Sequence, residues 1–410
     1  MTQLAESIKV VDTDAHVSEP ADLWTSRLPK RWRADAPRVD DGVWYLGTHR
    51  MTPVGLFAAG GWKEYLPSNP PSLEEADPAV YDPAKRIERM DDFGIYAQVL
   101  YPNILGFESF AFMEHQDAEF SSACVSAYND YITEFASTDP DRLLPITVLP
   151  FWDVAASVTE MRRCAGMGHR GILFANKYEN AGLPVFTDRH WDPIFDAASE
   201  LGLAINFHVS FASMSRTADS ADAELLKKLT TRTQGARAGE APTTDLLKSS
   251  EPNLIYDFVQ TISGSLLGNA PTIISLLMSD VCDRYPELNF VSVESGMGYV
   301  PYLLEGLDWN WHTYGGPAAF PNRLLPSEYF RRQCYGTFWF EKVSLAMLSE
   351  YPDNFMFETD FPHGGSLTPG PCSFAEVPSV HIEHQMAGVP PEVARKALFG
   401  NAARIYNIPS

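Results

Sequence analysis

Residues 143–175, LLPITVLPFWDVAASVTEMRRCAGMGHRGILFA, contain two short apolar runs separated by a longer amphipathic stretch. The runs LLPITVLP and GILFA have the composition of buried strands, and DVAASVTEMRRCAGMG has helical spacing. Strands that are apolar on both faces are typical of a parallel sheet covered by helices. This segment therefore predicts one β–α–β unit.

The same alternation continues on both sides of this unit. Strands are expected at 8–11, 96–102, 203–209, 288–295 and 354–360, and helices at 82–94, 115–137, 192–202, 270–287 and 344–352. About seven to eight strand–helix units close a barrel rather than an open sheet. The sequence has no GxGxxG after the first strand and no GxxxxGK followed by Ser or Thr, which disfavours a nucleotide-binding sheet. We therefore predict a distorted (β/α)8 TIM barrel that occupies residues 1–410 as a single domain.

Two stretches interrupt the alternation. Residues 40–80 are irregular and contain several prolines, and we interpret them as a hairpin and loops over one end of the barrel. Residues 211–253 are polar and charged and directly follow the strand expected at 203–209. They are either a solvated insertion or a lid, because insertions on that side of a barrel lie over the active site.

The chain is strongly acidic. It has 31 Lys and Arg against 53 Asp and Glu, a formal charge of -22 over 410 residues. A surface of this sign repels nucleic-acid phosphates and anionic lipid heads, so neither partner is expected. Hydrophobic residues make up 45% of the chain, enough for a large core, and the sequence has no uninterrupted run of 18 apolar residues that would predict a membrane-spanning helix.

The N-terminus and the cysteines favour a cytoplasmic location. The first residues, MTQLAESIKVVDTDAHV, lack the basic and apolar regions of a signal peptide. The 5 cysteines are scattered and form no CxxC pair, as expected for reduced thiols. We therefore expect a soluble cytoplasmic protein.

Polar residues stand where several strands are expected to end, which is where barrel enzymes have their chemistry. Asp14 and His16 follow the first strand, and their spacing of two places both side chains on the same side of an extended segment. His208, Glu294 and Asp360 stand at the ends of three later strands.

Each of these residues alone has an ordinary structural explanation. Asp-x-Asp-x-His is commonly a turn, an isolated His208 is typical of a core histidine, and Asp360 of a cap or turn. Those explanations do not account for their joint occurrence after a first, a middle and a last strand. Because carboxylates and imidazoles suit zinc, iron or manganese, we predict a metal held by Asp14, His16, His208 and Asp360.

Several segments, spread over essentially the whole chain, resemble one enzyme family. They are VVDTDAHVSEP, the FHV histidine, ESGMGYVPYLLEGLD, ETDFPH and ALFGNAARIYNI. Together they are similar to the amidohydrolase-related branch of the amidohydrolase superfamily, which includes aminocarboxymuconate-semialdehyde decarboxylase and resorcylate-type decarboxylases. The resemblance implies a distorted TIM barrel with a divalent metal at its C-terminal mouth.

Two positions depart from the family pattern. The usual His-x-His pair falls on Asp14 and His16, and Glu294 stands where a histidine often follows the sixth strand. A carboxylate in place of an imidazole favours a harder metal or a second ion, so one or two ions per chain are expected. Glu294 is interpreted as a metal ligand, as a general base, or as a structural carboxylate paired with an arginine.

The resemblance implies that Asp360 accepts a proton from metal-bound water, and we expect hydrolysis of an amide, ester, lactone or thioester. The first alternative is metal-dependent decarboxylation of an aromatic or unsaturated acid, and the second is a non-catalytic binding protein on the same fold. Glu19, Asn103 and His363 are expected to contact the small-molecule substrate. Because barrels of this branch often form dimers, a homodimer is expected.

Overall fold

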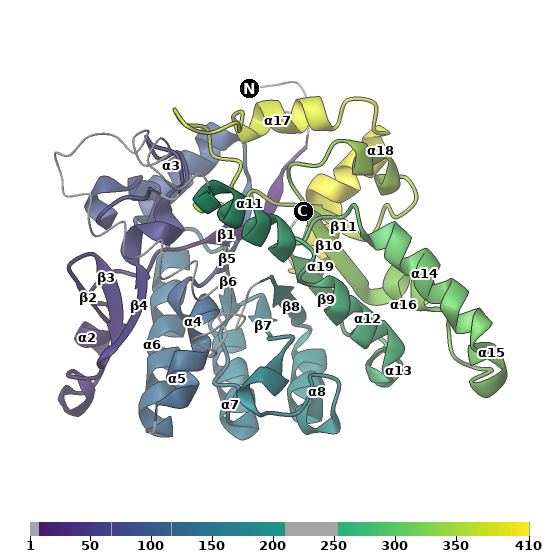
Figure 1. Cartoon of the computed structure of the whole chain (residues 1–410), viewed down its shortest axis with the longest axis horizontal. Helices are drawn as coiled ribbons and strands as arrows, with labels where there is room; N and C mark the ends of the chain where they lie inside the picture. The colour runs from purple at the N-terminus through teal and green to yellow at the C-terminus, as the bar shows by residue number, and fades with distance from the viewer. Residues whose placement is uncertain (1–7, 67, 116, 210–252, 410) are drawn as a thin grey trace.

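The computed structural model describes residues 8–66, 68–115, 117–209 and 253–409. Its central feature is one sheet of 8 parallel strands in the order β1-β5-β6-β7-β8-β9-β10-β11, surrounded by helices (Figure 1). The strands are β1 (Val11–His16), β5 (Ala97–Tyr101), β6 (Leu143–Thr147), β7 (Gly171–Leu173), β8 (Ala204–His208), β9 (Phe290–Val293), β10 (Cys334–Phe338) and β11 (Phe355–Phe357).

The first strand and the segment after the last strand meet and nearly close the sheet. Ala15 and Phe361 form a parallel bridge. The backbone N–H of His16 donates to Phe361 O (2.6 Å), and that of Asp360 donates to Asp14 O (2.9 Å). The predicted distorted (β/α)8 barrel is therefore confirmed, with β1 and β11 side by side.

Helices follow the strands on the outside of the barrel. Helix α7 (Val154–Gly166) begins where the Asp153 carboxylate accepts the Ala156 N–H, and it buries Met161 and Cys164 against the sheet. The other α-helices in the described residues are α2 (Leu23–Arg27), α3 (Pro83–Phe93), α4 (Ile104–Phe107), α5 (Ser109–Glu114), α6 (Ala118–Ala136), α8 (Asp192–Leu201), α11 (Asn253–Ser265), α12 (Ala270–Met278), α13 (Val281–Arg284), α14 (Val300–Thr313), α15 (Gly316–Ala319), α16 (Pro326–Gln333), α17 (Pro378–Gln385), α18 (Pro391–Arg395) and α19 (Asn401–Ile405).

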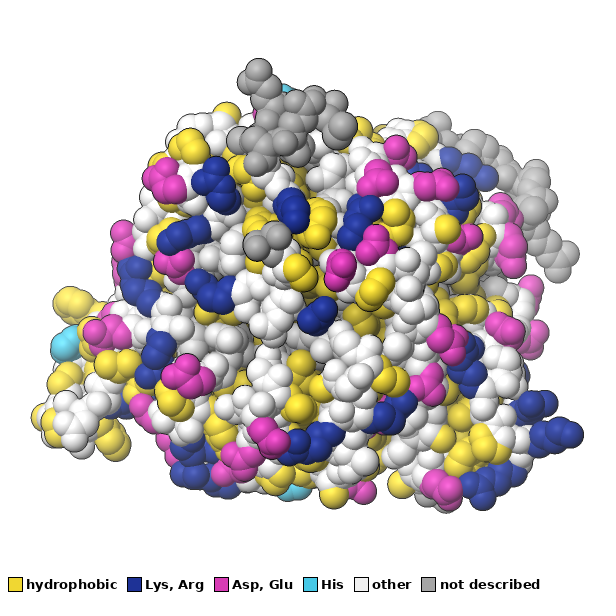
Figure 2. All heavy atoms as spheres, turned by 180° about the vertical axis from the view of Figure 1, so that it is seen from behind, with side chains coloured by type: hydrophobic (Ala, Val, Ile, Leu, Met, Phe, Trp, Pro, Cys, Tyr) yellow, Lys and Arg dark blue, Asp and Glu magenta, His cyan; other side chains and the backbone are white. Residues whose placement is uncertain are grey.

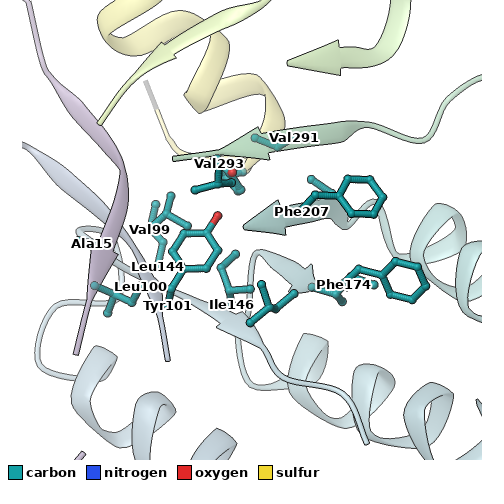
Figure 3. Close-up of a cluster of buried hydrophobic side chains, with 14 of the residues drawn as sticks. Ala15, Val99, Leu100, Tyr101, Leu144, Ile146, Phe174, Phe207, Val291 and Val293 are labelled. Atoms are coloured by element: carbon teal, nitrogen blue, oxygen red, sulfur yellow. The ribbon is translucent and has the colours of Figure 1, made fainter. Parts of the chain in front are cut away.

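The strands supply a continuous apolar core, as their sequences predict. Figure 3 shows the buried side chains Val99, Leu144, Ile146, Phe207, Val291 and Val293 gathered around Tyr101. The Tyr101 hydroxyl and the Tyr406 hydroxyl both donate to Asn206 Oδ1, at 3.1 and 2.7 Å. These bonds pair the hydroxyl groups of Tyr101 and Tyr406 within the apolar core.

Three local expectations need correction. The first strand is β1, so Asp14 and His16 lie within a fully buried strand instead of following one that ends at 11. The strand β10 was not predicted, because CYGTF is short, contains a glycine and directly follows helix α16. The helix expected at 344–352 is the shorter 3-10 helix η7 (Val343–Leu348).

The insertion predicted at 40–80 contains most of a small antiparallel sheet. Its strands are β2 (Arg38–Asp40), β3 (Val43–Leu46) and β4 (His49–Pro53), followed by the 3-10 helix η2 (Val54–Ala58). The Gly60 N–H donates to Pro362 O at 2.7 Å, which joins the end of this insertion to the loop after β11. The second insertion, predicted at 211–253, lies outside the described residues except for its last one.

One described segment, Phe258–Met278, is long and apolar enough to cross a membrane by length and composition alone, with a mean hydropathy of 1.3 and 28% of the window buried. A turn between α11 and α12 divides it. In that turn the buried Asn269 Nδ2 donates to Phe207 O (2.7 Å) and Val293 O (3.1 Å). Helix α12 is therefore tied to the ends of β8 and β9 as part of the barrel's outer layer.

The surface seen from behind carries both signs of charge. Figure 2 shows Lys and Arg side chains interspersed with Asp and Glu across that face. The acidic excess of the chain is therefore not gathered into one area of that face.

Candidate metal centre

Strand β1 directs two ligand-type side chains into the C-terminal mouth of the barrel. Asp14 and His16 are both fully buried, and they alternate with Thr13, whose hydroxyl donates to Phe357 O at 2.9 Å. Asp14 Oδ1 lies 3.4 Å from His16 Nε2 and 3.4 Å from His208 Nε2. The expected proximity of Asp14, His16 and His208 is therefore present, and a single ion can contact all three.

The two histidines face one another through the same nitrogen. His16 Nδ1 lies 3.1 Å from Pro102 O, and His208 Nδ1 lies 2.7 Å from Val209 O. Because a carbonyl oxygen only accepts, each Nδ1 carries a proton. The Nε2 atoms are 3.0 Å apart, so a cation, either a proton or a metal ion, is required between them.

Asp360 lies beside this group at the closing edge of the barrel. Its Oδ1 is 3.9 Å from His16 Nε2 and 2.7 Å from His363 Nδ1. The other ring nitrogen of His363, Nε2, lies 3.0 Å from Asn103 Oδ1. Asn103 thus contacts His363, and His363 contacts Asp360, the candidate metal ligand that lies beside His16.

Two glutamates complete the cluster. Glu294 Oε2 is 3.6 Å from His208 Nδ1, and its side chain is 19% exposed. Glu358 is fully buried, and its Oε2 accepts the Glu294 N–H at 3.3 Å. Glu358 was missed in the sequence, although it stands two residues before Asp360 and so shares its side of an extended segment.

The electrostatics of the cluster favour a cation next to Asp14. Burial and the Asp14 carboxylate raise the pKa of Glu358 and Asp360 well above the usual range, and burial and Asp360 do the same for Glu294. Burial alone would lower the pKa of His208, but Asp14 outweighs it and raises that pKa to about 9. The histidines in turn lower the pKa of Asp14 despite its burial. Asp14 therefore stays ionised and attracts positive charge.

An aromatic pair, Phe57 and Phe107, covers the cluster. Their rings are stacked with centroids 4.8 Å apart. The Phe107 ring lies 5.9 Å from His16 and 5.8 Å from His208, and Phe57 lies 5.6 Å from His363. Phe57 comes from η2, within the 40–80 insertion, and no sequence pattern identified it. The arrangement offers a flat apolar surface beside the metal ligands.

Glu19 is the least involved of the predicted residues. Its buried Oε1 accepts the N–H groups of Asn103 and Ile104, at 3.0 and 2.9 Å, and so holds the start of α4. Burial raises the pKa of Glu19 to about 7. Glu19 therefore has a structural role in positioning Asn103, and its contact with substrate stays a prediction.

A family model described as amidohydrolase matches residues 11–408. The chain belongs to the amidohydrolase family. Gamma-resorcylate decarboxylase of Rhizobium sp. (strain MTP-10005) is 22% identical over 290 residues, 68% of this chain and 76% of that protein. This chain is thus a relative of the decarboxylase group that its motifs resemble.

Solved structures share the fold over nearly the whole chain. An amidohydrolase of Mycobacterium avium subsp. paratuberculosis K-10 has a TM-score of 0.68, 21% identity and coverage of 97% of this chain and 99% of its own. A dihydroxybenzoic acid decarboxylase of Polaromonas sp. JS666 with bound manganese has a TM-score of 0.59, 16% identity and coverage of 98% and 97%.

These relatives correct the expected reaction. We expected an amidohydrolase-family hydrolase that cleaves an amide, ester, lactone or thioester, and this expectation is wrong. The curated relatives that match over 290 residues are gamma-resorcylate decarboxylases, and structural neighbours include further decarboxylases. The first alternative drawn from the sequence, decarboxylation, fits these findings.

The residues of the cluster suit a divalent metal of the kind that the family implies. Neither carboxylate oxygen of Asp14 has a hydrogen-bond partner among the described residues, although both are buried. Asp360 is also buried, and its Oδ1 lies 2.7 Å from His363 Nδ1. Buried oxygens without donors, beside two facing imidazole nitrogens, are what a metal ion would satisfy.

Proposed function

We propose that the chain catalyses metal-dependent, non-oxidative decarboxylation of a small aromatic or unsaturated carboxylic acid. The observation that carries the proposal is the convergence of Asp14, His16, His208 and Asp360 beneath the aromatic pair. Its reaction type is supported by the decarboxylase relatives.

The metal would be held by Asp14, His16, His208 and Asp360, and manganese is the metal we propose. Two carboxylates and two imidazoles accept Mn²⁺, and a structural neighbour has manganese bound. When bound, the ion supplies positive charge for the substrate carboxylate and an adjacent oxygen.

The reaction also needs a proton donor and an apolar surface for the substrate, and side chains of this protein supply both. Loss of carbon dioxide leaves an electron pair on the carbon, which must take up one proton to give the product. We assign the delivery of that proton to Asp360, because it stands at the edge of the cluster and is the carboxyl group that His363 contacts. His363, 2.7 Å from Asp360 Oδ1 and itself held by Asn103, orients this carboxyl group. Phe107 and Phe57 provide an apolar surface for a planar substrate and exclude water.

The test is carbon dioxide release from 2,6-dihydroxybenzoate and 5-carboxyvanillate, the acids named for two structural neighbours. In D₂O, the product should carry one deuterium at the carbon that lost the carboxylate, as read by NMR. Chelator-treated protein and Asp360→Asn should release little carbon dioxide. If the folded, manganese-loaded protein releases none from a panel of aromatic and unsaturated acids, the proposal is wrong.

The domain organisation, cellular location and oligomeric state of the enzyme are also proposals. We propose one barrel domain over residues 1–410 that works in the cytoplasm as a homodimer. Light scattering on the purified protein measures the dimer, and limited proteolysis that leaves one protected fragment supports the single domain.

A further inference from the structure

The side chains around the candidate metal centre are not equally buried. Those of the four candidate ligands are at most 4% exposed, whereas that of His363 is 11% exposed and that of Glu294 is 19% exposed. Solvent therefore reaches the cluster where His363 and Glu294 stand. A substrate must approach the ligands from the same side.

A cavity of about 1110 Å³ borders the segment that contains His363. It is formed by the loop after β10, by η7, by the loop after β11 and by α17. Ser366 in its wall donates its hydroxyl to His363 O at 2.6 Å, and the next wall residue, Leu367, donates its N–H to Thr359 O at 2.9 Å. This part of the wall is thus bonded to the segment that carries Asp360.

Another part of the cavity wall is bonded to the loop that contains Glu294. Trp339, directly after β10, donates its N–H to Glu341 Oε2 at 2.9 Å, and Glu341 Oε1 accepts the Met297 N–H at 2.7 Å. The two loops approach so closely that a Cβ at Gly296 would lie 2.6 Å from Glu341 Oε1. The cavity therefore borders the segments of both of the more exposed side chains.

The lining of the cavity combines aromatic rings with a free cation. The rings of Trp339 and Phe340 pack edge to face, with centroids 4.6 Å apart. The ammonium group of Lys342 forms no ion pair and no hydrogen bond among the described residues. Glu376 is the only carboxylate among the described lining residues, and it lies 2.8 Å from His384 Nδ1. Such a lining suits an anion that carries an apolar ring.

We propose that this cavity is an entry site, which binds a small aromatic carboxylate before it reaches the metal centre. The carboxylate lies near Lys342, and the ring lies against Trp339 and Phe340. The class of acid rests on the proposed function, whereas the site itself is separate from the metal ligands. In a chain with a formal charge of -22, an unpaired lysine at the entrance offsets the repulsion that an anionic substrate otherwise meets.

Cys372 provides a chemical probe inside the cavity. It lines the cavity and is partly exposed, whereas the other four of the 5 cysteines are buried. N-phenylmaleimide should therefore alkylate Cys372 first. Saturating 2,6-dihydroxybenzoate, the acid named for a structural neighbour, should slow this alkylation by about 10-fold or more in the manganese-loaded protein, as followed by mass spectrometry. Resorcinol, which lacks the carboxylate, should give little protection.

Two comparisons locate the protecting site. Protection should persist after a chelator has removed the metal, because the entry site does not use the ion. It should be lost in Lys342→Gln, and KM for the acid should rise roughly 5-fold in this variant with little change in kcat. Lys30→Gln is the matched control, because Lys30 is exposed and does not line the cavity. It should have the protection and the KM of wild type.

Alkylation should also obstruct the entrance. Wild type that carries the phenylmaleimide group on Cys372 should have a higher KM for the acid than the untreated protein. Cys372→Ser should have the same KM before and after the same treatment.

Three outcomes overturn the inference and leave the proposed function intact. They are carbon dioxide release without protection of Cys372, alkylation of Cys372 that leaves KM unchanged, and failure of the reagent to reach Cys372 in an active enzyme. By contrast, protection that depends on Lys342, without carbon dioxide release from any acid, would support the entry site and contradict the proposed function alone.

Discussion

At the residue scale, the candidate site depends on atoms whose usual partners are missing. Among the described residues, no donor forms a hydrogen bond to the carboxylate oxygens of Asp14, and the Nε2 atoms of His16 and His208 face each other at 3.0 Å. In an ordinary protein core, polar atoms this deeply buried are paired. The exception here is the reason to assign these residues to a metal rather than to the fold.

Removing His208 tests this assignment. His208→Ala should weaken Mn²⁺ binding by roughly 100-fold or more, because one of the few ligands is lost. Isothermal titration calorimetry measures the change. His384→Ala is the control, because His384 is exposed and bonded to Glu376, and it should bind Mn²⁺ like wild type. Equal affinity in His208→Ala would place the metal elsewhere.

A buried carboxyl group outside the site gives a prediction about pH. Burial raises the pKa of Glu108 from 4.5 to about 7, and one hydrogen bond from the Thr52 backbone opposes this only in part. Because the folded-state pKa is raised, ionisation of Glu108 destabilises the folded protein. Stability is therefore fully present below pH 4.5 and falls as the pH rises to about 7.

Glu108→Gln should remove this loss. At pH 8 the variant should be more stable than wild type by up to roughly 3 kcal/mol, and at pH 4 the two should be nearly equal. Urea denaturation at both pH values measures the difference. If the difference in unfolding free energy between the variant and wild type is the same at pH 8 as at pH 4, the raised pKa of Glu108 is contradicted.

At the element scale, the small sheet matters because its last strand, β4, leads directly into η2, which places Phe57 beside the candidate metal centre. The contact depends on Gly60, where a Cβ would lie 2.9 Å from Pro362 O. The sequence predicted a hairpin and loops over one end, and the structure contains them. It did not predict which side chain of the insertion reaches the site, because that depends on contacts with a loop more than 300 residues away in the chain.

Gly60→Ala tests this arrangement. The added methyl group should push η2 away from the loop after β11, destabilise the protein by about 1–3 kcal/mol and raise KM for an aromatic acid more than it lowers kcat. Steady-state kinetics and thermal denaturation measure both effects. Gly166→Ala is the control, because no atom lies within 4 Å of its added Cβ. An unchanged KM in Gly60→Ala would separate Phe57 from substrate binding.

At the scale of the whole molecule, one buried carboxylate links the first strand of the barrel to the segment after its last strand. Asp12 on β1 accepts the Thr359 N–H and hydroxyl, at 2.7 and 2.6 Å, and the Gln98 side chain at 2.8 Å. It thereby joins β1, β5 and the segment after β11. These bonds hold the segment that contains Asp360 against β1, which contains Asp14. The contacts that close the barrel therefore also bring the candidate metal ligands together.

Asp12→Ala should therefore affect stability and metal binding together. Loss of this buried network should cost about 3 kcal/mol of unfolding free energy and weaken Mn²⁺ binding by roughly 10-fold. Denaturant titration and calorimetry on the same preparation measure both. A loss of stability with normal Mn²⁺ affinity would show that the site assembles without this link.

The sequence by itself determined the barrel and most of the candidate ligands. Apolar strands that alternate with amphipathic helices have few alternatives to a closed parallel sheet, and Asp14, His16, His208 and Asp360 stand near strand ends that such a sheet must bring together. These properties follow from local periodicity, which each segment carries on its own.

Only the tertiary structure decided which atoms face one another. It added β10 to the sheet and placed Phe57 over the cluster. It also placed Glu358 where it accepts the Glu294 N–H, and gave Glu19 a structural role at the start of α4. None of these contacts is local in sequence. Each depends on closure of the barrel, where the position of a side chain is set by partners from distant strands rather than by its neighbours in the chain.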